Sequence, residues 1–112
     1  MQKIGKKALD VLRFVRQFLP DNPIVIEAGA FKGQDSVAIS SFWSSGSVYS
    51  FEPVLDLFEK LVLATEFHKN ITCYPYALGE VTGKVSLHLA KRAANLDEVT
   101  QASCVLPPAE RL

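Results

Sequence analysis

The spacing of apolar residues divides the chain into alternating helices and strands. Between residues 4 and 19 they recur every three or four positions, which predicts an amphipathic helix that ends at Pro20. Residues 24–27 form an apolar run without alternation, which is typical of a strand covered on both faces. Helical spacing returns from Gln34 or Asp35 to Trp43. A second strand follows at 48–52, and a third helix is predicted from Pro53 to Thr65.

Two more strands are predicted in the second half of the chain. Asn70 marks a turn into residues 71–76, where Pro75 lacks a donor and therefore predicts a position at an edge or end of the sheet. Residues 84–89 alternate with period two, which predicts a half-exposed strand able to form a hairpin with the third. From Lys91 onward the pattern fades.

Helices that alternate with strands through short turns predict a Rossmann-like, doubly wound, mainly parallel α/β sheet. Only the first three strand–helix units and one hairpin strand are found, and nothing after Leu89 supplies strands for the other side of the first strand. We therefore interpret the chain as the amino-terminal part of a longer domain. It comprises a helix over residues 1–20, a cofactor-binding half-domain over 21–90 and an irregular tail over 91–112.

The composition is that of a globular domain. Hydrophobic residues make up 48% of the 112 positions, and twelve basic side chains are balanced by twelve acidic ones. The balance gives no indication of nucleic acid or an anionic membrane as a partner, and no run is long enough to span a bilayer. Cys73 and Cys104 lack metal-ligand spacing. We predict reduced thiols in a cytoplasmic protein without a metal site.

The candidate chemistry lies where the first strand ends. Glu27 and Ala28 lead into Gly29, and Gly33 follows before the next helix. A side chain at Gly29 would block a ligand lying across the strand end, and one at Gly33 would push the helix off the sheet. Glu52, at the end of the second strand and 19 positions past Gly33, is expected beside this loop, where a ribose would lie.

The charge of Glu27 selects among cofactors. A dinucleotide would place its pyrophosphate in this loop, where Glu27 opposes it, and Phe31 occupies the place of a close-approach glycine. S-adenosylmethionine instead presents cationic groups that Glu27 can attract and a carboxylate that the helix amides after Gly33 can hold. Glu52 can accept its ribose hydroxyls, while Phe51 and Leu78 can line an apolar slot for adenine.

Each candidate also has a purely structural interpretation. Glu27 can be a solvated strand end, and Glu52 can cap the helix that starts at Pro53. Asp35 fits a helix cap or a partner of the helix dipole. His68 and His88 have no partner spacing for metal or nucleophilic chemistry, and Trp43 fits a core position.

Three stretches together resemble the FkbM-type family of S-adenosylmethionine-dependent methyltransferases. They are Val25–Ser36, Val48–Pro53 and Ala77–Glu80, in the family's order. The resemblance implies a class I methyltransferase fold that transfers a methyl group to oxygen on a sugar or small metabolite. Matched by position, the cofactor residues are Glu27, Ala28, Gly29, Gly33, Glu52, Pro53, Ala77 and Leu78.

The chain departs from the family in two places. Phe31 stands where the family commonly has asparagine, and the family's Lys-x-Asp-x-Glu-Gly-type segment on a fourth strand does not occur. Two alternatives therefore stay open beside the methyltransferase. One is a nicotinamide-dependent reductase of short-chain type, and the other is a non-catalytic truncated fragment. The catalytic base, the methyl acceptor and the oligomeric state are not specified by these residues.

Overall fold

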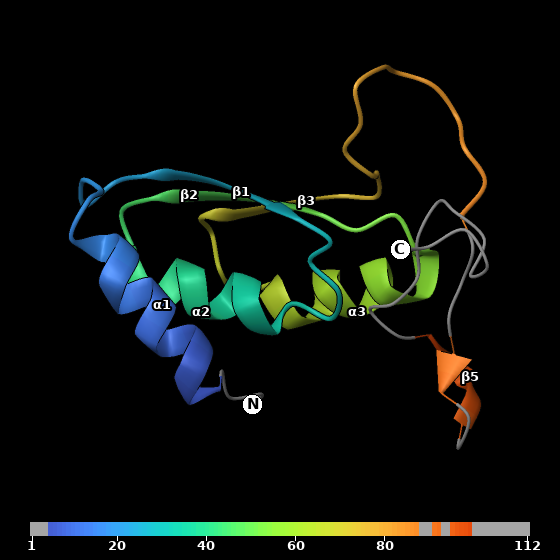
Figure 1. The fold of residues 1–112 in the computed structure, drawn as a ribbon, viewed down its shortest axis with the longest axis horizontal. Helices are drawn as coiled ribbons and strands as arrows, with labels where there is room; N and C mark the ends of the chain where they lie inside the picture. Colours follow the sequence, from blue (N-terminus) through green and yellow to red (C-terminus); the bar gives the residue numbers. More distant parts are fainter. Residues whose placement is uncertain (1–4, 88–90, 93–94, 100–112) are drawn as a thin grey trace. The chain divides into compact units, whose positions relative to one another are not determined.

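Three parallel strands form the sheet of the first structural unit. The computed structural model describes residues 5–87, 91–92 and 95–99, and it divides into the units 1–78 and 79–112. Strands β1 (Ile24–Ala28), β2 (Ser47–Phe51) and β3 (Ile71–Tyr74) are ordered β1-β2-β3 (Figure 1). Ala28 pairs with Phe51, and Phe51 pairs with Tyr74. The predicted parallel α/β sheet is confirmed, and β3 lies at its edge and ends before Pro75, as its missing N–H requires.

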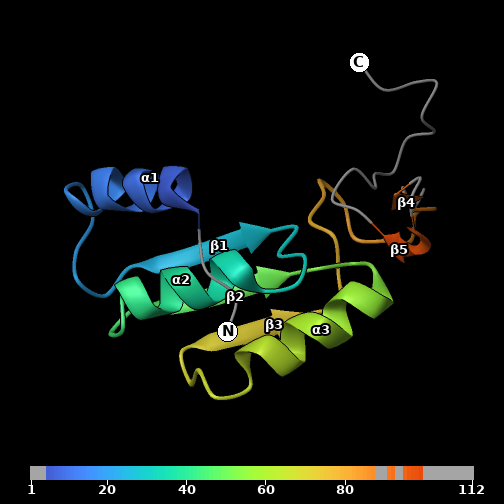
Figure 2. The ribbon, with the colours of Figure 1, turned by 90° about the horizontal axis from the view of Figure 1, so that it is seen from below.

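The three helices α1 (Lys6–Arg16), α2 (Gln34–Phe42) and α3 (Leu55–Thr65) all lie on one side of this sheet (Figures 1 and 2). Helix α1 is shorter than predicted, because the amides of Gln17, Phe18 and Leu19 bond three residues back in a tighter turn. Helix α3 begins at Leu55, not at Pro53. The extended Val54 and its hydrogen bond to Glu52 keep both preceding residues outside the helix.

The core lies between the sheet and helices α2 and α3. Leu57, Leu61 and Thr65 are the buried residues of α3, and Val48 of β2 is among the most deeply buried side chains. Leu55 and Val62 of the same helix are exposed and take no part in this core. Apolar residues on several faces of α3 left its inward face ambiguous in the sequence.

The other face of the sheet is open. Ile24 and Ile26 of β1 are 74% and 64% exposed, so the prediction that this strand is covered on both faces is wrong for the described residues. Farther along the same face, the rings of Phe51 and Tyr74 stack with their centroids 4.8 Å apart. The three described helices lie on the opposite side of the sheet, with α2 and α3 packed against it, which explains the exposure of these side chains.

The second unit contains an antiparallel pair, β4 (Lys91–Arg92) and β5 (Asn95–Val99), where an irregular tail was predicted. The strand predicted at 84–89 is not found over residues 84–87, which have no regular structure. Its last two positions, His88 and Leu89, lie outside the described residues, as does Cys104. Within the described ranges, none of the helices has the length and apolarity that crossing a bilayer requires.

Candidate functional site

The carboxyl ends of the three strands meet at one edge of the sheet and are joined by backbone hydrogen bonds. The amides of Gly29 and Ala30 both donate to the carbonyl of Phe51 at 2.9 Å, and the amide of Glu52 donates to the carbonyl of Tyr74 at 3.0 Å. The loop after β1 and the turn after β2 are therefore held side by side. Pro53 is half-buried in that turn, while Ala77 and Leu78 are exposed in the segment that follows β3.

Gly29 and Gly33 differ in what surrounds them. Both have positive φ, +74° and +92°, which only glycine adopts without strain. A Cβ on Gly29 would meet open space at the strand edge. A Cβ on Gly33 would lie 3.1 Å from Leu61 Cδ1 and 3.2 Å from Ala64 Cβ. We predicted that Gly33 allows its helix to pack closely on the sheet. That prediction is wrong about the neighbouring element, because the backbone at Gly33 closely approaches α3 and not the sheet.

Glu52 connects the two loops. Its side chain is only 4% exposed, and its two oxygens accept separate backbone hydrogen bonds. Oε1 accepts from the amide of Phe31 and Oε2 from the amide of Val54, both at 2.9 Å. Each carboxylate oxygen can accept more than one hydrogen bond, so these two bonds fix the position of the carboxylate and leave it able to accept further hydrogen bonds.

Phe31 adopts a backbone conformation that is unusual for its residue type. Its φ is +57°, in the left-handed region where asparagine is tolerated and bulky side chains are strained. The amide of Phe31 nevertheless reaches Glu52, and the Lys32 ammonium lies 5.1 Å from the centre of its ring. The asparagine common at this position in the resembled family fits the same backbone more readily.

Glu27 lies on the helix-facing side of β1 and bonds to two buried serines. Its Oε1 accepts hydrogen bonds from Ser36 Oγ of α2 and, at 3.0 Å, from Ser50 Oγ of β2. Burial raises the pKa of Glu27, against the lowering effect of the two serine hydroxyls, and the charge of Asp35 adds to the rise. Part of its acceptor capacity is thus used inside the fold and not at the open edge.

Sequence reasoning missed both of these serines. Ser50 is two positions from Val48, which places both on the buried face of β2, and Ser36 lies in the first turn of α2. A polar residue on the inward side of a buried strand requires a partner, and that was the available signal. Asp35 also lies in the first turn of α2, where its charge suits the helix dipole.

Comparison with known proteins identifies the fold. No known family and no curated protein matches the sequence. Among solved structures, a fibrillarin/Nop5p complex matches with a TM-score of 0.50 and 20% identity, over 58% of this chain and 32% of the other. A proposed rRNA-methylase from Clostridium thermocellum matches with a TM-score of 0.53 and 13% identity, over 66% of this chain and 42% of the other.

The chain has a Rossmann-like methyltransferase fold. It spans less than half the length of either neighbour. The class I methyltransferase fold is thereby confirmed at the level of architecture, while neither neighbour shows membership of the FkbM-type family.

The neighbours of this methyltransferase fold contradict the prediction about partners. We expected a small-molecule or sugar substrate and no nucleic acid, but one neighbour is named for rRNA and the other is in a complex with Nop5p. The exclusion of nucleic acid failed because it rested on net charge, which averages over the whole surface, whereas the sugar or small-molecule substrate rested on the family resemblance alone. Helix α1 alone carries four basic residues and one acidic residue.

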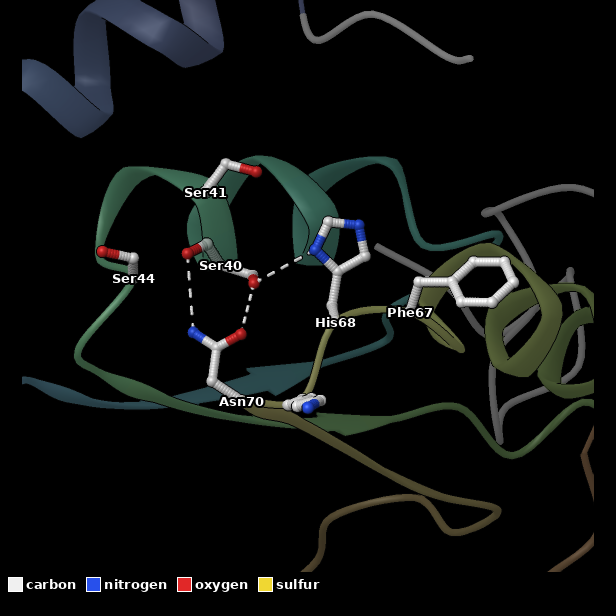
Figure 3. Close-up of a pocket in the computed structure, with 7 residues that line it drawn as sticks. Ser40, Ser41, Ser44, Phe67, His68 and Asn70 are labelled. Atoms are coloured by element: carbon white, nitrogen blue, oxygen red, sulfur yellow. Dashed lines mark hydrogen bonds between the residues drawn. The ribbon is translucent and has the colours of Figure 1, made fainter.

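A polar pocket of about 320 Å³ lies at the other end of the parallel sheet, where α2 ends and β3 begins (Figure 3). Asn70 occupies its base and donates to the carbonyls of Ser40 and Trp43 at 3.4 and 3.3 Å, while Ser40 Oγ donates to its amide oxygen. His68 Nδ1 lies 3.4 Å from the same hydroxyl. These contacts satisfy carbonyls at the end of α2, so we assign the pocket a structural role.

The described residues of this fold contain no cluster of three or more His, Cys, Asp or Glu side chains that could hold a metal ion. Cys73 is a free, half-buried thiol in β3, with its sulfur 3.3 Å from Thr65 Oγ1. Trp43 is buried, as predicted for a core residue.

Proposed function

We propose that the chain binds S-adenosylmethionine at the carboxyl edge of its sheet, as the cofactor-binding part of a methyltransferase. The observation that supports this most directly is the presence of both Gly29 and Glu52 at this edge. Gly29 leaves open space in front of the first loop, and a buried carboxylate is fixed beside that loop by the amide of Phe31. Ligands of open α/β sheets bind outside this edge.

The residues at the edge match the parts of the cofactor. Glu52 would accept hydrogen bonds from the ribose hydroxyls, with Pro53 holding the turn that carries it. The first amides of α2, which no side chain caps, would receive the carboxylate of the methionine part. Ala77 and Leu78, together with Phe51, would contact the adenine. Glu27 and Ala28 would border the cationic end, Glu27 through the acceptor capacity that Ser36 and Ser50 leave.

The cofactor supplies a methyl group on a positively charged sulfur. The task of the protein at this edge is to hold that carbon in line with the acceptor atom and to exclude water, because alignment provides much of the rate of such a displacement. Gly33 contributes indirectly, since it allows the start of α2 to approach α3 and so fixes the helix amides beside the loop.

RNA is the acceptor class that we propose to test first, since one structural neighbour is named as an rRNA-methylase. Labelled methyl transfer from S-adenosylmethionine to total RNA would be measured with and without ribonuclease. Label that stays with protein after ribonuclease treatment would reject RNA as acceptor without affecting the cofactor proposal.

Calorimetric titration with S-adenosylhomocysteine tests the cofactor site itself. The wild-type chain should bind, and Glu52→Gln should weaken binding about tenfold or more, because it removes charged acceptors for two hydroxyls. Gly29→Ala should also weaken binding, whereas Ser44→Ala in the opposite pocket should not. Absence of binding by a folded wild-type chain would overturn the proposal, and equal binding by Glu52→Gln would remove Glu52 from the site.

One observation favours a second candidate, a non-catalytic fragment. The open face of β1, with Ile24 and Ile26 exposed, is apolar surface that a complete doubly wound domain would cover. A chain that binds S-adenosylhomocysteine but transfers no methyl group would support this alternative. Tighter binding of NADH than of S-adenosylhomocysteine would instead support the nicotinamide-dependent reductase.

A further inference from the structure

Helix α1 presents an apolar stripe on a basic surface. Val11, Phe14 and Phe18 are 57%, 62% and 71% exposed, and the rings of Phe14 and Phe18 pack edge to face at 5.4 Å. With Lys7 they follow the spacing four, three, four. Lys7, Val11 and Phe14 lie along one face of α1, and Phe18, in the tighter turn that follows the helix, packs against Phe14; these four residues are here called the α1 stripe. No residue of α1 is fully buried. The charged residues of the helix are Lys6, Lys7, Arg13 and Arg16 against Asp10.

Helix α3 presents a stripe of the same length and the opposite charge. Leu55, Glu59, Val62 and Glu66 repeat the spacing four, three, four and are all exposed; they are here called the α3 stripe. Exposed Leu63 and Phe67 widen its apolar part. The charged residues from Leu55 to Glu66 are Asp56, Glu59 and Glu66 against Lys60.

The two stripes match in dimension as well as in charge. Each runs from its first to its last residue over eleven residue steps, 7 to 18 and 55 to 66, which corresponds to about 16 Å at the rise of an α-helix. An antiparallel arrangement would place Lys7 opposite Glu66 and Phe18 opposite Leu55. Helices α1 and α3 lie on either side of α2, so the stripes of one copy do not cover each other (Figure 2).

We propose that the α1 stripe of one copy packs antiparallel on the α3 stripe of a second copy. The contact buries the Phe18 ring against Leu55 and packs Val11 against Val62, and it pairs the basic helix with the acidic one. Because the two surfaces differ, each copy offers one of each, and the contact either closes reciprocally into a dimer or continues into longer assemblies. An anionic membrane would attract the basic α1 but would repel the acidic α3 stripe. A second copy of the chain offers a complementary surface to both stripes.

Sedimentation velocity of the 112-residue chain over a range of concentrations tests this contact. Wild type should associate, and added salt should weaken the association. Lys7→Glu and Glu66→Lys should each weaken it about three- to tenfold. An equimolar mixture of these two variants should regain wild-type affinity, because the reversed charges then face each other across one contact. Asp21→Lys, a charge reversal at an exposed turn position that belongs to neither stripe, is the matched control and should leave the association unchanged.

Three results would overturn the proposal. The first is a wild-type chain that stays monomeric at every concentration. The second is a mixture of Lys7→Glu and Glu66→Lys that associates no better than either variant alone. The third is association that both stripe variants retain and Ile24→Lys abolishes, since that would place the interface on the open sheet face. Binding to anionic vesicles that Lys7→Glu abolishes, without self-association, would likewise assign α1 to a membrane.

Discussion

The backbone amide of Phe31 donates a hydrogen bond to the Glu52 carboxylate over 2.9 Å, across 21 positions of sequence. Through this bond, the residue that follows β2 holds the loop that follows β1. The same carboxylate holds the amide of Val54 at the start of α3. Glu52 is therefore expected to support the fold of the carboxyl edge even before any ligand binds there.

Replacing Glu52 by alanine should destabilise the chain by about 1–3 kcal/mol, because two amides lose their acceptor beside a buried position. Glu52→Gln, which keeps one carbonyl oxygen, should lose less. Urea unfolding followed by circular dichroism measures both changes. Equal stability of the alanine variant and wild type would show that water replaces the carboxylate without cost.

Phe31→Asn should be more stable than Phe31→Ala by about 0.5–1 kcal/mol. Both variants lose the ring and its contact with Lys32, but asparagine tolerates the left-handed backbone that alanine resists. The comparison between the two variants therefore isolates the backbone term. Thermal unfolding at one pH measures the difference. A melting temperature of the alanine variant equal to or above that of the asparagine variant would contradict the positive φ at residue 31.

Gly29→Ala and Gly33→Ala form a matched pair, since both place a side chain at positive φ. We expect a loss of about 1 kcal/mol at Gly29, where the added methyl group meets open space, and about 2 kcal/mol or more at Gly33, where it meets Leu61 and Ala64. Denaturant midpoints of the two variants give the difference. A larger loss at Gly29 would reverse our assignment of the crowded position.

Glu27→Gln should change how stability depends on pH. Burial raises the pKa of Glu27 in the folded chain above the ordinary value of 4.5, so the native state holds this proton more tightly than the unfolded state does. Stability is therefore lost as pH rises from about 4.5 through the raised pKa. The glutamine variant lacks this loss, and its stability relative to wild type should increase from pH 4 to pH 7.

Ser50→Ala is the companion variant for this prediction. It removes one of the hydroxyls that lower the pKa of Glu27, so the loss of stability between pH 4 and pH 7 should exceed that of wild type. Urea titrations at several pH values measure both effects. A stability difference between wild type and Glu27→Gln that stays constant with pH would contradict the raised pKa.

The order and type of the elements up to residue 74 followed from the sequence because each has a clear period or a buried apolar run. The strand at 24–28 and the helix at 34–42 are examples, with Gly29 and Gly33 marking the turn between them. The inward face of α3 did not follow, since leucine and valine occur on several sides of that helix. Residues 84–87 illustrate the opposite error. Their apolar and polar residues alternate as in a strand, yet they form no strand in the structure.

Within the candidate site, the sequence located Glu52 and Gly29 at one edge but not the bonds that fix them. Glu27 was expected to face a ligand, yet Ser36 and Ser50 engage it inside the fold. Hydroxyl partners 9 and 23 positions away are invisible to local spacing. They depend on the parallel register of β1 and β2 and on the start of α2, which only the folded chain brings together.

The burial of Trp43 gives this chain a built-in optical reporter. It is the single tryptophan of the sequence and is 4% exposed, with the ring of Phe42 5.1 Å away. Its indole N–H has no hydrogen-bond partner among the described residues. Tryptophan emission should therefore be blue-shifted in the native chain and should move to longer wavelength when α2 separates from the sheet. One fluorescence signal thus follows the packing of that helix in every variant above.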